Sequence, residues 1–400
     1  MQPKKRALML AGGALCVPAL LPVRVATAAG KSAIIAISAE ISHLTSLSDD
    51  AIIAGMSIAL EDLNNSTGRK KFHWELLKYD NGSISGKGVA HLHELAKREN
   101  LVGVFGGKFS PVMLAMMPVA TELKIPLFAP WSAADDITAY PQKAPYVFRL
   151  SIRDSWAMSR LVERAIAEGY RTLGLLTPNS SWGRSCITAI ERKILSIPPG
   201  KKPRLIGEFY NWGGEPTLLP QYRNLLKNGA DVLILVANEP EAALLATELA
   251  AQPPTYQRLP ILSHWGVAGG DTFALSKGTI KNLNFAFVQS FSFQRTRSAT
   301  ASRLAERASR LLAISNMNAF PAQVGIAHAY DLMMMIGSAV SQLDKITGPD
   351  VAKAMTDIRL HHGVIKRYSS PYAGNRRDAL SESDIFLCRY TENGEIRPEP

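Results

Sequence analysis

Short apolar runs of strand length alternate with segments of helical periodicity along most of the chain. The first pair is the run 33–38 followed by residues 51–64, in which Ile52, Met56 and Leu63 fall on one face of a helix. Repeated alternation of this kind is typical of a parallel sheet with helices on both faces. The pattern therefore predicts an α/β, doubly wound fold.

The remaining elements fall into two groups, because the pattern restarts after Val147. The first group has strands over 72–79, 101–105 and 126–129 and helices over 87–98 and 112–123. The second has strands over 172–177, 205–210, 231–236, 260–263 and 284–290 and helices over 155–168, 184–195, 217–227 and 240–251. Helices over 299–313, 322–343 and 349–358 and a strand over 384–390 complete the chain. We therefore expect two doubly wound lobes of similar size.

The first 28 residues read as a cleavable signal peptide. A basic start precedes an apolar stretch over 7–21, which is interrupted by Pro18, and small residues surround position 28. The stretch is too short and poorly flanked for a membrane span. A retained anchor and a lipidated Cys16 are the alternatives. We expect export to the periplasm, with cleavage after about Ala28.

Composition and charge limit the classes of partner that the protein is expected to bind. The chain has 400 residues, 46% of them hydrophobic and 20% charged, a balance typical of folded domains. The net charge of +11 falls to +7 without the leader, and the remaining basic residues are scattered. Because no basic stripe is interleaved with aromatic residues, we expect no nucleic-acid partner. Cys186 and Cys388 remain after cleavage, and the sequence leaves open whether they pair.

In parallel sheets, ligands bind beyond the carboxyl ends of the strands, where loops lead into helices. After the run 101–105 comes Gly-Gly-Lys-Phe-Ser-Pro over 106–111. Its glycines allow close approach of a ligand to the backbone, and Ser110 can cap the following helix, so a carboxylate suits this loop. The same residues also suit an ordinary capped turn.

Four further loops hold candidate side chains. Trp131, Ser132 and Ala133 follow the fourth strand of the first group, and Trp182, Asn238 and Trp265 lie in the corresponding loops of the second group; each tryptophan suits binding or packing equally. No nucleophile elbow, phosphate-binding loop or dinucleotide fingerprint occurs, and the histidine pairs at 91/93 and 361/362 lack metal-ligand spacing. We therefore expect no enzyme activity, no catalytic residue, no metal and no cofactor.

The order and spacing of several motifs resemble those of periplasmic substrate-binding proteins of ABC importers, of the leucine/isoleucine/valine-binding type (type I periplasmic binding proteins). These motifs are GMSIALEDLN over 55–64, Tyr-Asp-Asn over 79–81, the Gly106-Gly107 loop with Ser110, Ile-Pro over 125–126, Val-Phe-Arg over 147–149 and Ala-Tyr-Asp over 329–331. The resemblance spans about residues 31–395. It implies two lobes joined by a three-segment hinge: residues 29–148 plus about 293–365, and residues 149–292 plus about 366–400.

The resemblance also implies a ligand site. Ser110 matches the serine that contacts the ligand's carboxylate, and Trp131, Ser132 and Ala133 match the next binding loop. Trp182 matches an aromatic lid, and Asn238 a contact on the closing lobe; Lys108, Phe109 and Ser48 are secondary candidates.

Two positions depart from the family pattern. Ala133 replaces a common hydroxyl, so Ser132 is expected to serve instead. Trp265 replaces the acid that pairs with an amino acid's ammonium, which weakens the case for a free amino acid; Glu239 or Asp136 are the candidate substitutes.

The expected function is capture of a small carboxylate, amide or amino-acid-like ligand between two closing lobes. The partners expected are the small ligand and an ABC permease of the inner membrane, with the protein acting as a monomer. The alternative is a sensor component that presents its closed form to a membrane signalling protein.

Overall fold

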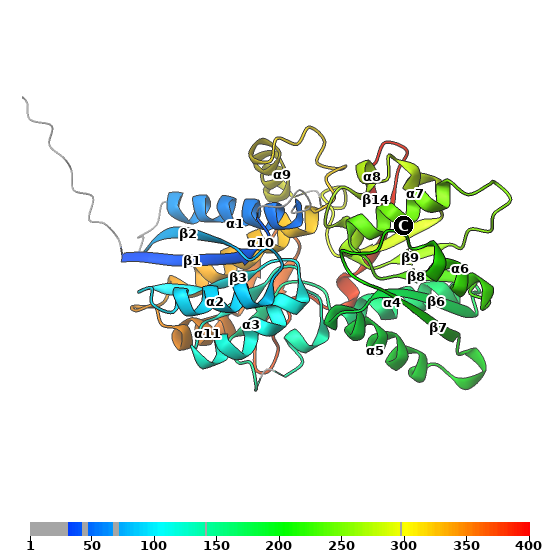
Figure 1. The fold of residues 1–400 in the computed structure, drawn as a ribbon. Coiled ribbons are helices and arrows are strands. Elements are labelled where there is room, and N and C mark those ends of the chain that lie inside the picture. Colours follow the sequence, from blue (N-terminus) through cyan, green and yellow to red (C-terminus); the bar gives the residue numbers. More distant parts are fainter. Residues whose placement is uncertain (1–30, 42–46, 67–71, 141, 297) are drawn as a thin grey trace, which may run out of the picture.

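The computed structural model describes residues 31–41, 47–66, 72–140, 142–296 and 298–400. The expected signal peptide and Cys16 lie outside these residues. The chain forms two α/β bodies side by side (Figure 1), each built on its own sheet. The first sheet has the order β2-β1-β3-β4-β5, and every pairing is parallel. Its strands are β1 (Lys31–Ala39), β2 (Phe72–Asp80), β3 (Leu101–Gly106), β4 (Leu127–Ala129) and β5 (Val147–Arg149).

Helices cover both faces of this sheet, as expected for parallel strands. Ile35 and Ile37 of β1 pack toward α1 and α10, whereas Ala36 packs with residues of α2 and α3. The helices of this lobe are α1 (Leu47–Asn65), α2 (Ser85–Leu95), α3 (Ser110–Glu122), α9 (Ala299–Leu311), α10 (Gln323–Val340) and α11 (Gly348–Asp357). The last three follow the second lobe in sequence, so the chain returns to complete the first lobe.

The second sheet has the order β14-β13-β10-β9-β8-β6-β7. Its parallel strands are β6 (Thr172–Pro178), β7 (Arg204–Tyr210), β8 (Val232–Leu235), β9 (Ile261–Ser263) and β10 (Phe285–Gln289). Its helices are α4 (Asp154–Ala167), α5 (Ser181–Ser196), α6 (Leu219–Lys227), α7 (Glu239–Ala250) and α8 (Thr272–Leu275). The strands β13 (Phe386–Tyr390) and β14 (Ile396–Pro398) extend it antiparallel. The predicted fold class is confirmed, and β14 is an addition that the sequence pattern did not predict.

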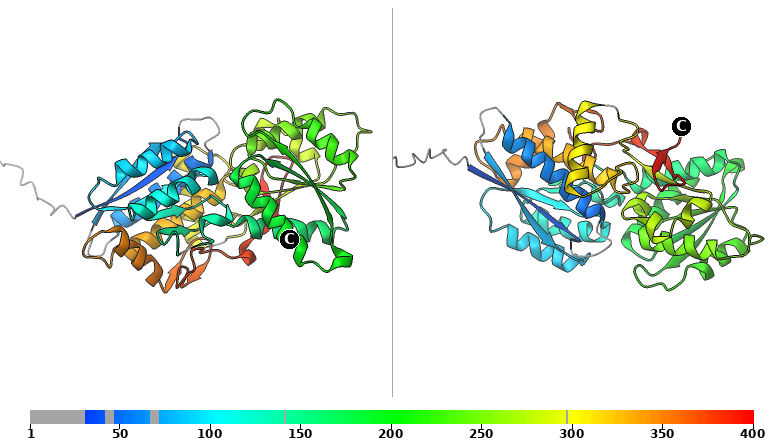
Figure 2. Two further views of the ribbon diagram at one scale, coloured as in Figure 1. Left: turned by 60° about the horizontal axis from the view of Figure 1, so that its bottom comes forward. Right: turned by 90° about the horizontal axis from the view of Figure 1, so that it is seen from above.

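The tail passes between the lobes, as the views from below and above show (Figure 2). The strands β11 (Leu360–His362) and β12 (Arg367–Ser369) form a hairpin. Beyond it, the chain runs along the edge of β5, where Arg149 N donates to Arg377 O (2.7 Å) and Ala379 N donates to Arg149 O (2.9 Å). The division into lobes at 29–148 plus about 293–365 and 149–292 plus about 366–400 stays a proposal. The hairpin favours a last crossing between residues 370 and 385.

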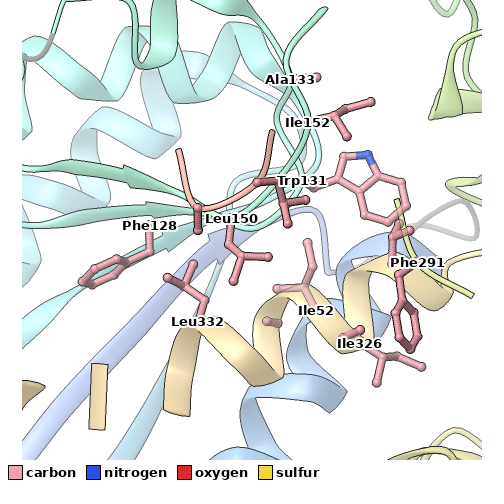
Figure 3. Close-up of a cluster of buried hydrophobic side chains, with 14 of the residues drawn as sticks. Ile52, Phe128, Trp131, Ala133, Leu150, Ile152, Phe291, Ile326 and Leu332 are labelled. Atoms are coloured by element: carbon pink, nitrogen blue, oxygen red, sulfur yellow. The ribbon is translucent and has the colours of Figure 1, made fainter. Parts of the chain in front are cut away.

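The largest apolar core is continuous through both lobes, because it includes Leu173, Val232 and Val288 of the second sheet as well as the residues of β1, α1 and α10. Figure 3 shows Trp131, Ile152 and Phe291 at the end of the cluster opposite Phe128. Trp131 is 3% exposed. Because its indole is part of the core, the loop that follows β4 is held by apolar packing. Cys186 and Cys388 are both buried free thiols.

The packing of α1 against α10 yields a first prediction. A Cβ added to Gly55 would lie 2.3 Å from Ile326 O, so Gly55→Ala forces two helix backbones apart. We expect it to lower the free energy of unfolding by about 1–3 kcal/mol. The matched control is Gly86→Ala in α2, where the new Cβ meets nothing within 4 Å. Urea denaturation that showed equal midpoints for both variants would contradict this packing.

Candidate functional site

Loops from both lobes meet in one small cavity between the lobes. It is lined by Lys108, Phe109, Ser110, Pro111, Trp131, Ala133, Ser180, Trp182, Trp212, Asn238, Trp265 and Gly266. These residues lie in the loops, or in the first turns of the helices, that follow β3, β4, β6, β7, β8 and β9, where parallel sheets bind ligands. The cavity encloses about 20 Å³, which is room for about one water molecule. In this conformation the lobes are closed on each other.

Aromatic rings occupy most of the space between the lobes. Trp131 and Trp265 face each other across the cleft with ring centroids 5.3 Å apart, and Phe109 packs on Trp212 at 4.5 Å. A Cβ on Gly266 would lie 2.8 Å from the ring of Trp182, so this glycine leaves room for the indole. The walls of the cavity are therefore largely aromatic, with polar side chains from Lys108, Ser110, Ser180 and Asn238.

The structure brings most of the sequence-predicted site residues together. Eight of them line the cavity: Lys108, Phe109, Ser110, Trp131, Ala133, Trp182, Asn238 and Trp265. Ser132 and Ser48 are buried nearby and do not line it. Ser132 donates a hydrogen bond to Gly107 O (2.9 Å), so it holds the neighbouring loop rather than the cavity wall.

Sequence reasoning missed Trp212, Ser180, Pro111 and Gly266 as lining residues. Trp212 is the clearest omission, because it follows β7 in the sequence Asn-Trp-Gly-Gly over 211–214. That is the kind of loop in which the other candidates were found. Its position after a strand and before two glycines was the available signal.

Ser110 differs from its expected role as a helix cap. It is the first residue of α3, with Phe109 at the N-cap and no capping hydrogen bond from a side chain. Its hydroxyl instead accepts a hydrogen bond from Ala134 N (3.2 Å). Because Ala134 belongs to the loop after β4, Ser110 ties two lining loops of the first lobe together.

A buried carboxylate fixes the loop that carries Lys108. The two oxygens of Asp49, in the first turn of α1, accept from Glu40 N (2.9 Å) and Lys108 N (2.8 Å). Burial raises the pKa of Asp49 to about 7, while the nearby ammonium of Lys108 and these two amides oppose the rise. Asp49 thus connects the loops after β1 and β3 from inside the protein.

Lys108 links the two lobes by a buried ion pair. Its Nζ lies 2.9 Å from Glu239 Oε1, at the start of α7, and 3.5 Å from Glu40 Oε2. Burial alone would lower the pKa of Lys108, but the carboxylates of Glu239 and Asp49 raise it above the ordinary value. The ammonium therefore stays charged. The side chain of Lys108 is only 4% exposed, so Lys108 is not a solvated loop lysine.

Glu239 is the partner of this lysine rather than a free acid. Burial raises its pKa, and Lys108 partly offsets that effect. Its position in the first turn of α7 also favours a negative charge. A second contact between the lobes is the hydrogen bond from Asp135 N to Ser185 Oγ (3.1 Å). Further hydrogen bonds join the loop after β4 to the start of α4, where Asp154 N donates to Ala133 O (2.8 Å) and Ser155 N donates to Asp135 Oδ1 (3.1 Å). The buried ion pair, these hydrogen bonds and the aromatic contacts thus hold the closed form.

His328 of α10 lies behind the tryptophans and connects three segments. Its ring nitrogens lie 2.9 Å from Ser290 Oγ and 2.8 Å from Pro130 O, and its ring centroid is 5.6 Å from that of Trp265. Burial lowers the pKa of His328 to about 4, against a smaller opposing effect of the Pro130 carbonyl. The imidazole is therefore neutral near pH 7.

A larger groove of about 760 Å³ lies outside the cleft, along residues 366–381 of the tail. It is open to solvent and includes Arg153, Trp156 and Arg377 among its lining residues. The cavity between the lobes is the better candidate site, because there the loops of both sheets converge on a few polar groups set in apolar walls.

Comparisons with known proteins agree with this geometry. A family model described as periplasmic binding protein matches residues 35–391. A search of curated protein sequences found no match. Among solved structures, the chain is similar to a type 1 periplasmic binding protein from Bordetella pertussis (TM-score 0.80, 16% identity, 92% of this chain and 100% of that one).

Two other similar structures have ligands in their descriptions. One is a leucine-binding protein from Thermotoga maritima (TM-score 0.77, 17% identity, 92% of this chain and 98% of that one). The other is an ABC transporter solute-binding protein from Rhodopseudomonas palustris in complex with 4-hydroxybenzoate (TM-score 0.74, 14% identity, 92% of this chain and 96% of that one). At these identities the likeness shows a shared fold.

The ion pair between the lobes is open to a direct test. Glu239→Gln keeps the shape of the side chain but leaves the ammonium of Lys108 without its closest carboxylate. Loss of one partner of a buried pair costs on the order of 3 kcal/mol, so the variant is expected to open. Small-angle X-ray scattering should show a larger radius of gyration. Asp357→Asn, which breaks the exposed pair with Lys353 in α11, is the control and should change nothing.

His328 predicts a pH dependence of stability. Its pKa in the folded protein lies below the unfolded value of 6.5. The folded state therefore binds fewer protons, and stability is lost as the pH falls from about 6.5 toward 4. Relative to His328→Gln, wild type should lose about 2–3 kcal/mol between pH 7.5 and 4.5. Urea unfolding at both pH values measures this difference, and parallel losses in the two proteins would contradict it.

Proposed function

Because the chain belongs to the periplasmic binding protein family, we propose that it captures a small ligand between its two lobes and delivers it to an ABC importer. The observation that carries this proposal is the convergence of loops from both sheets on one cavity. Lining residues come from each lobe, so a bound ligand touches both lobes only in the closed form. Ligand binding then shifts an equilibrium between open and closed states.

The chemistry of the cavity supports a carboxylate or amide with an aromatic or other apolar body. Four lining tryptophans, Trp131, Trp182, Trp212 and Trp265, offer flat apolar surfaces. Lys108 is the cationic residue among those lining the cavity. A ligand carboxylate there would replace Glu239 as the partner of the ammonium, with Ser110 beside it. The protein from Rhodopseudomonas palustris, with its 4-hydroxybenzoate, is a precedent within the fold for such a ligand.

A free amino acid fits this cavity less well. Its ammonium needs an acidic partner, but no acid is among the described residues that line the cavity, and Glu239 is already paired with Lys108. An unpaired buried ammonium is costly. The position of Trp265 also argues against a free amino acid, since an indole stands where an acid would be required to pair with the ligand's ammonium.

Binding requires the lobes to separate from the observed arrangement. The cavity holds about one water, so a ligand must enter while Trp131 and Trp265 are apart. Only molecules in the open state can admit a ligand. Because the empty protein favours the closed state, the apparent affinity equals the affinity of the open state multiplied by the fraction of molecules that are open. Ligands that bind well must therefore recover the contacts between the aromatic rings and the pairing of Lys108.

We propose that the protein is exported to the periplasm, which the family and the expected signal peptide both support. Within the part of the chain that the structure describes, no helix combines the length and apolar character needed to cross a bilayer. We propose that the protein works there as a monomer and docks its closed form on a permease. Transport is preferred to sensing, because solved structures of the same fold are described as components of ABC transporters.

The proposal predicts which side chains contact the ligand. Thermal shift with a panel of aromatic carboxylates, amides and amino acids should identify a ligand, since a concentration of 100 times Kd adds about 2.7 kcal/mol. Ser110→Ala and Trp182→Ala should each weaken its binding at least tenfold, about 1.4 kcal/mol. Isothermal titration calorimetry gives the affinities.

The matched control is Trp156→Ala, which removes an indole of α4 that does not line the cavity. It should bind as wild type does. Unchanged affinity in the Ser110 and Trp182 variants would contradict the assigned site. A panel without a single hit on folded protein would contradict the ligand class.

A further inference from the structure

Three side chains with metal-binding atoms meet inside the second lobe, behind the lining tryptophans. Asp154 begins α4, Cys186 lies in α5, and His264 follows β9. One donor atom from each, an oxygen, a sulfur and a nitrogen, lies within 4.8 Å of the other two. All three residues are fully buried. None of them lines the cavity between the lobes, so the cluster is separate from the proposed ligand site.

The hydrogen bonds of this cluster are incomplete. Asp154 Oδ1 accepts from Trp182 Nε1 (3.2 Å) and lies 3.0 Å from His264 Nε2. Among the described residues, Asp154 Oδ2 and His264 Nδ1 have no hydrogen-bond partner and His264 Nε2 makes no aligned hydrogen bond, while the Cys186 thiol interacts with the Asp154 carboxylate. Buried polar atoms without partners are rare and costly in native proteins. Their presence in one cluster points to a missing partner.

We propose that Asp154, Cys186 and His264 form a binding site for a divalent zinc-like cation. Carboxylate oxygen, thiolate sulfur and imidazole nitrogen are the three donor types that zinc takes in proteins. A tetrahedral ion at the usual bond lengths needs donors roughly 3.5 Å apart. The three donors lie within 4.8 Å of one another, and Asp154 Oδ1 and His264 Nε2 are 3.0 Å apart, so rotations of the side chains would bring the set to that spacing. The fourth position is left for water or another small ligand.

Binding exchanges a proton for the cation. The thiol of Cys186 is neutral without a metal, because burial and the neighbouring Asp154 raise its pKa well above the ordinary value. When the metal–sulfur bond forms, the S–H bond breaks and the proton leaves to solvent, so the metal gains a thiolate. The cation then also compensates the buried carboxylate of Asp154. No oxidation or reduction is involved.

The site is coupled to the cleft through Trp182. Its indole donates to the same carboxylate oxygen that lies nearest His264, and the Trp182 and His264 rings meet edge-on with centroids 5.2 Å apart. A cation on Asp154 Oδ1 competes with the Trp182 hydrogen bond. Metal binding is thus expected to loosen one wall of the cavity between the lobes. The metal site itself forms whether or not the organic ligand is bound.

Cobalt(II) provides a direct probe, because a Co²⁺–thiolate bond absorbs in the near ultraviolet. The full chain carrying Cys16→Ser keeps two of its three cysteines, Cys186 and Cys388. Metal-free protein is titrated with Co²⁺, both in the native state and by refolding in its presence, so that burial does not prevent loading. We expect one equivalent of Co²⁺ with a thiolate band, and its displacement by Zn²⁺.

Variants distinguish this site from other thiol chemistry. Cys186→Ser should abolish the thiolate band, and Asp154→Asn and His264→Gln should each weaken Co²⁺ binding at least tenfold. Cys388→Ser removes the other buried thiol, in β13, and should leave the band unchanged. Circular dichroism checks that each variant is folded.

Absence of the band in the Cys16→Ser chain after both loading procedures would overturn the proposal. So would a band that depends on Cys388. A colourless, metal-free protein that still binds its organic ligand would leave the proposed function intact, so the two proposals fail separately.

Discussion

The closed arrangement depends on a single buried positive charge. Lys108 reaches from the first lobe to Glu239 of the second, and Asp49 holds the backbone of the same lysine from beneath. An ammonium in an apolar interior is tolerated only with close carboxylates around it. Through this one lysine, Asp49 and Glu239 connect the start of α1, the loop after β3 and the start of α7. Around it, aromatic rings supply area and exclude water, which strengthens the ion pair.

The sequence predicted the helices and strands well, but it predicted poorly where polar side chains point. Alternating periodicity predicted both sheets, because burial of parallel strands on two faces leaves an apolar signature that is local in sequence. It also predicted five of the six loops that line the cavity, and missed the loop after β7 that carries Trp212. The hydroxyl of Ser110 was expected at a helix cap and instead meets Ala134, and Ser132 turns toward Gly107. Those directions depend on partners more than 20 residues away.

Long-range proximity explains the other omissions. Asp154, Cys186 and His264 come from three different elements of the second lobe, and no spacing rule connects them. The same is true of Lys108 and Glu239, which are 131 residues apart. The strand β14 has three residues, too few for a periodic pattern. Charge pairs and short edge strands depend on contacts that exist only in the assembled fold. The periodic patterns of strands and helices are local and can be recognised in the sequence alone.

The order of the strands also determines when each lobe is able to fold during synthesis. The second sheet takes β13 from residues 386–390 beside β10, and the first lobe takes α10 from residues 323–340. Neither lobe is a continuous stretch of chain, so an emerging polypeptide has no complete core to bury until nearly all of it has been made. Contacts that span such separations also form slowly. Both lobes are therefore completed late in synthesis, although the apolar cluster built from residues 36–147 is available earlier.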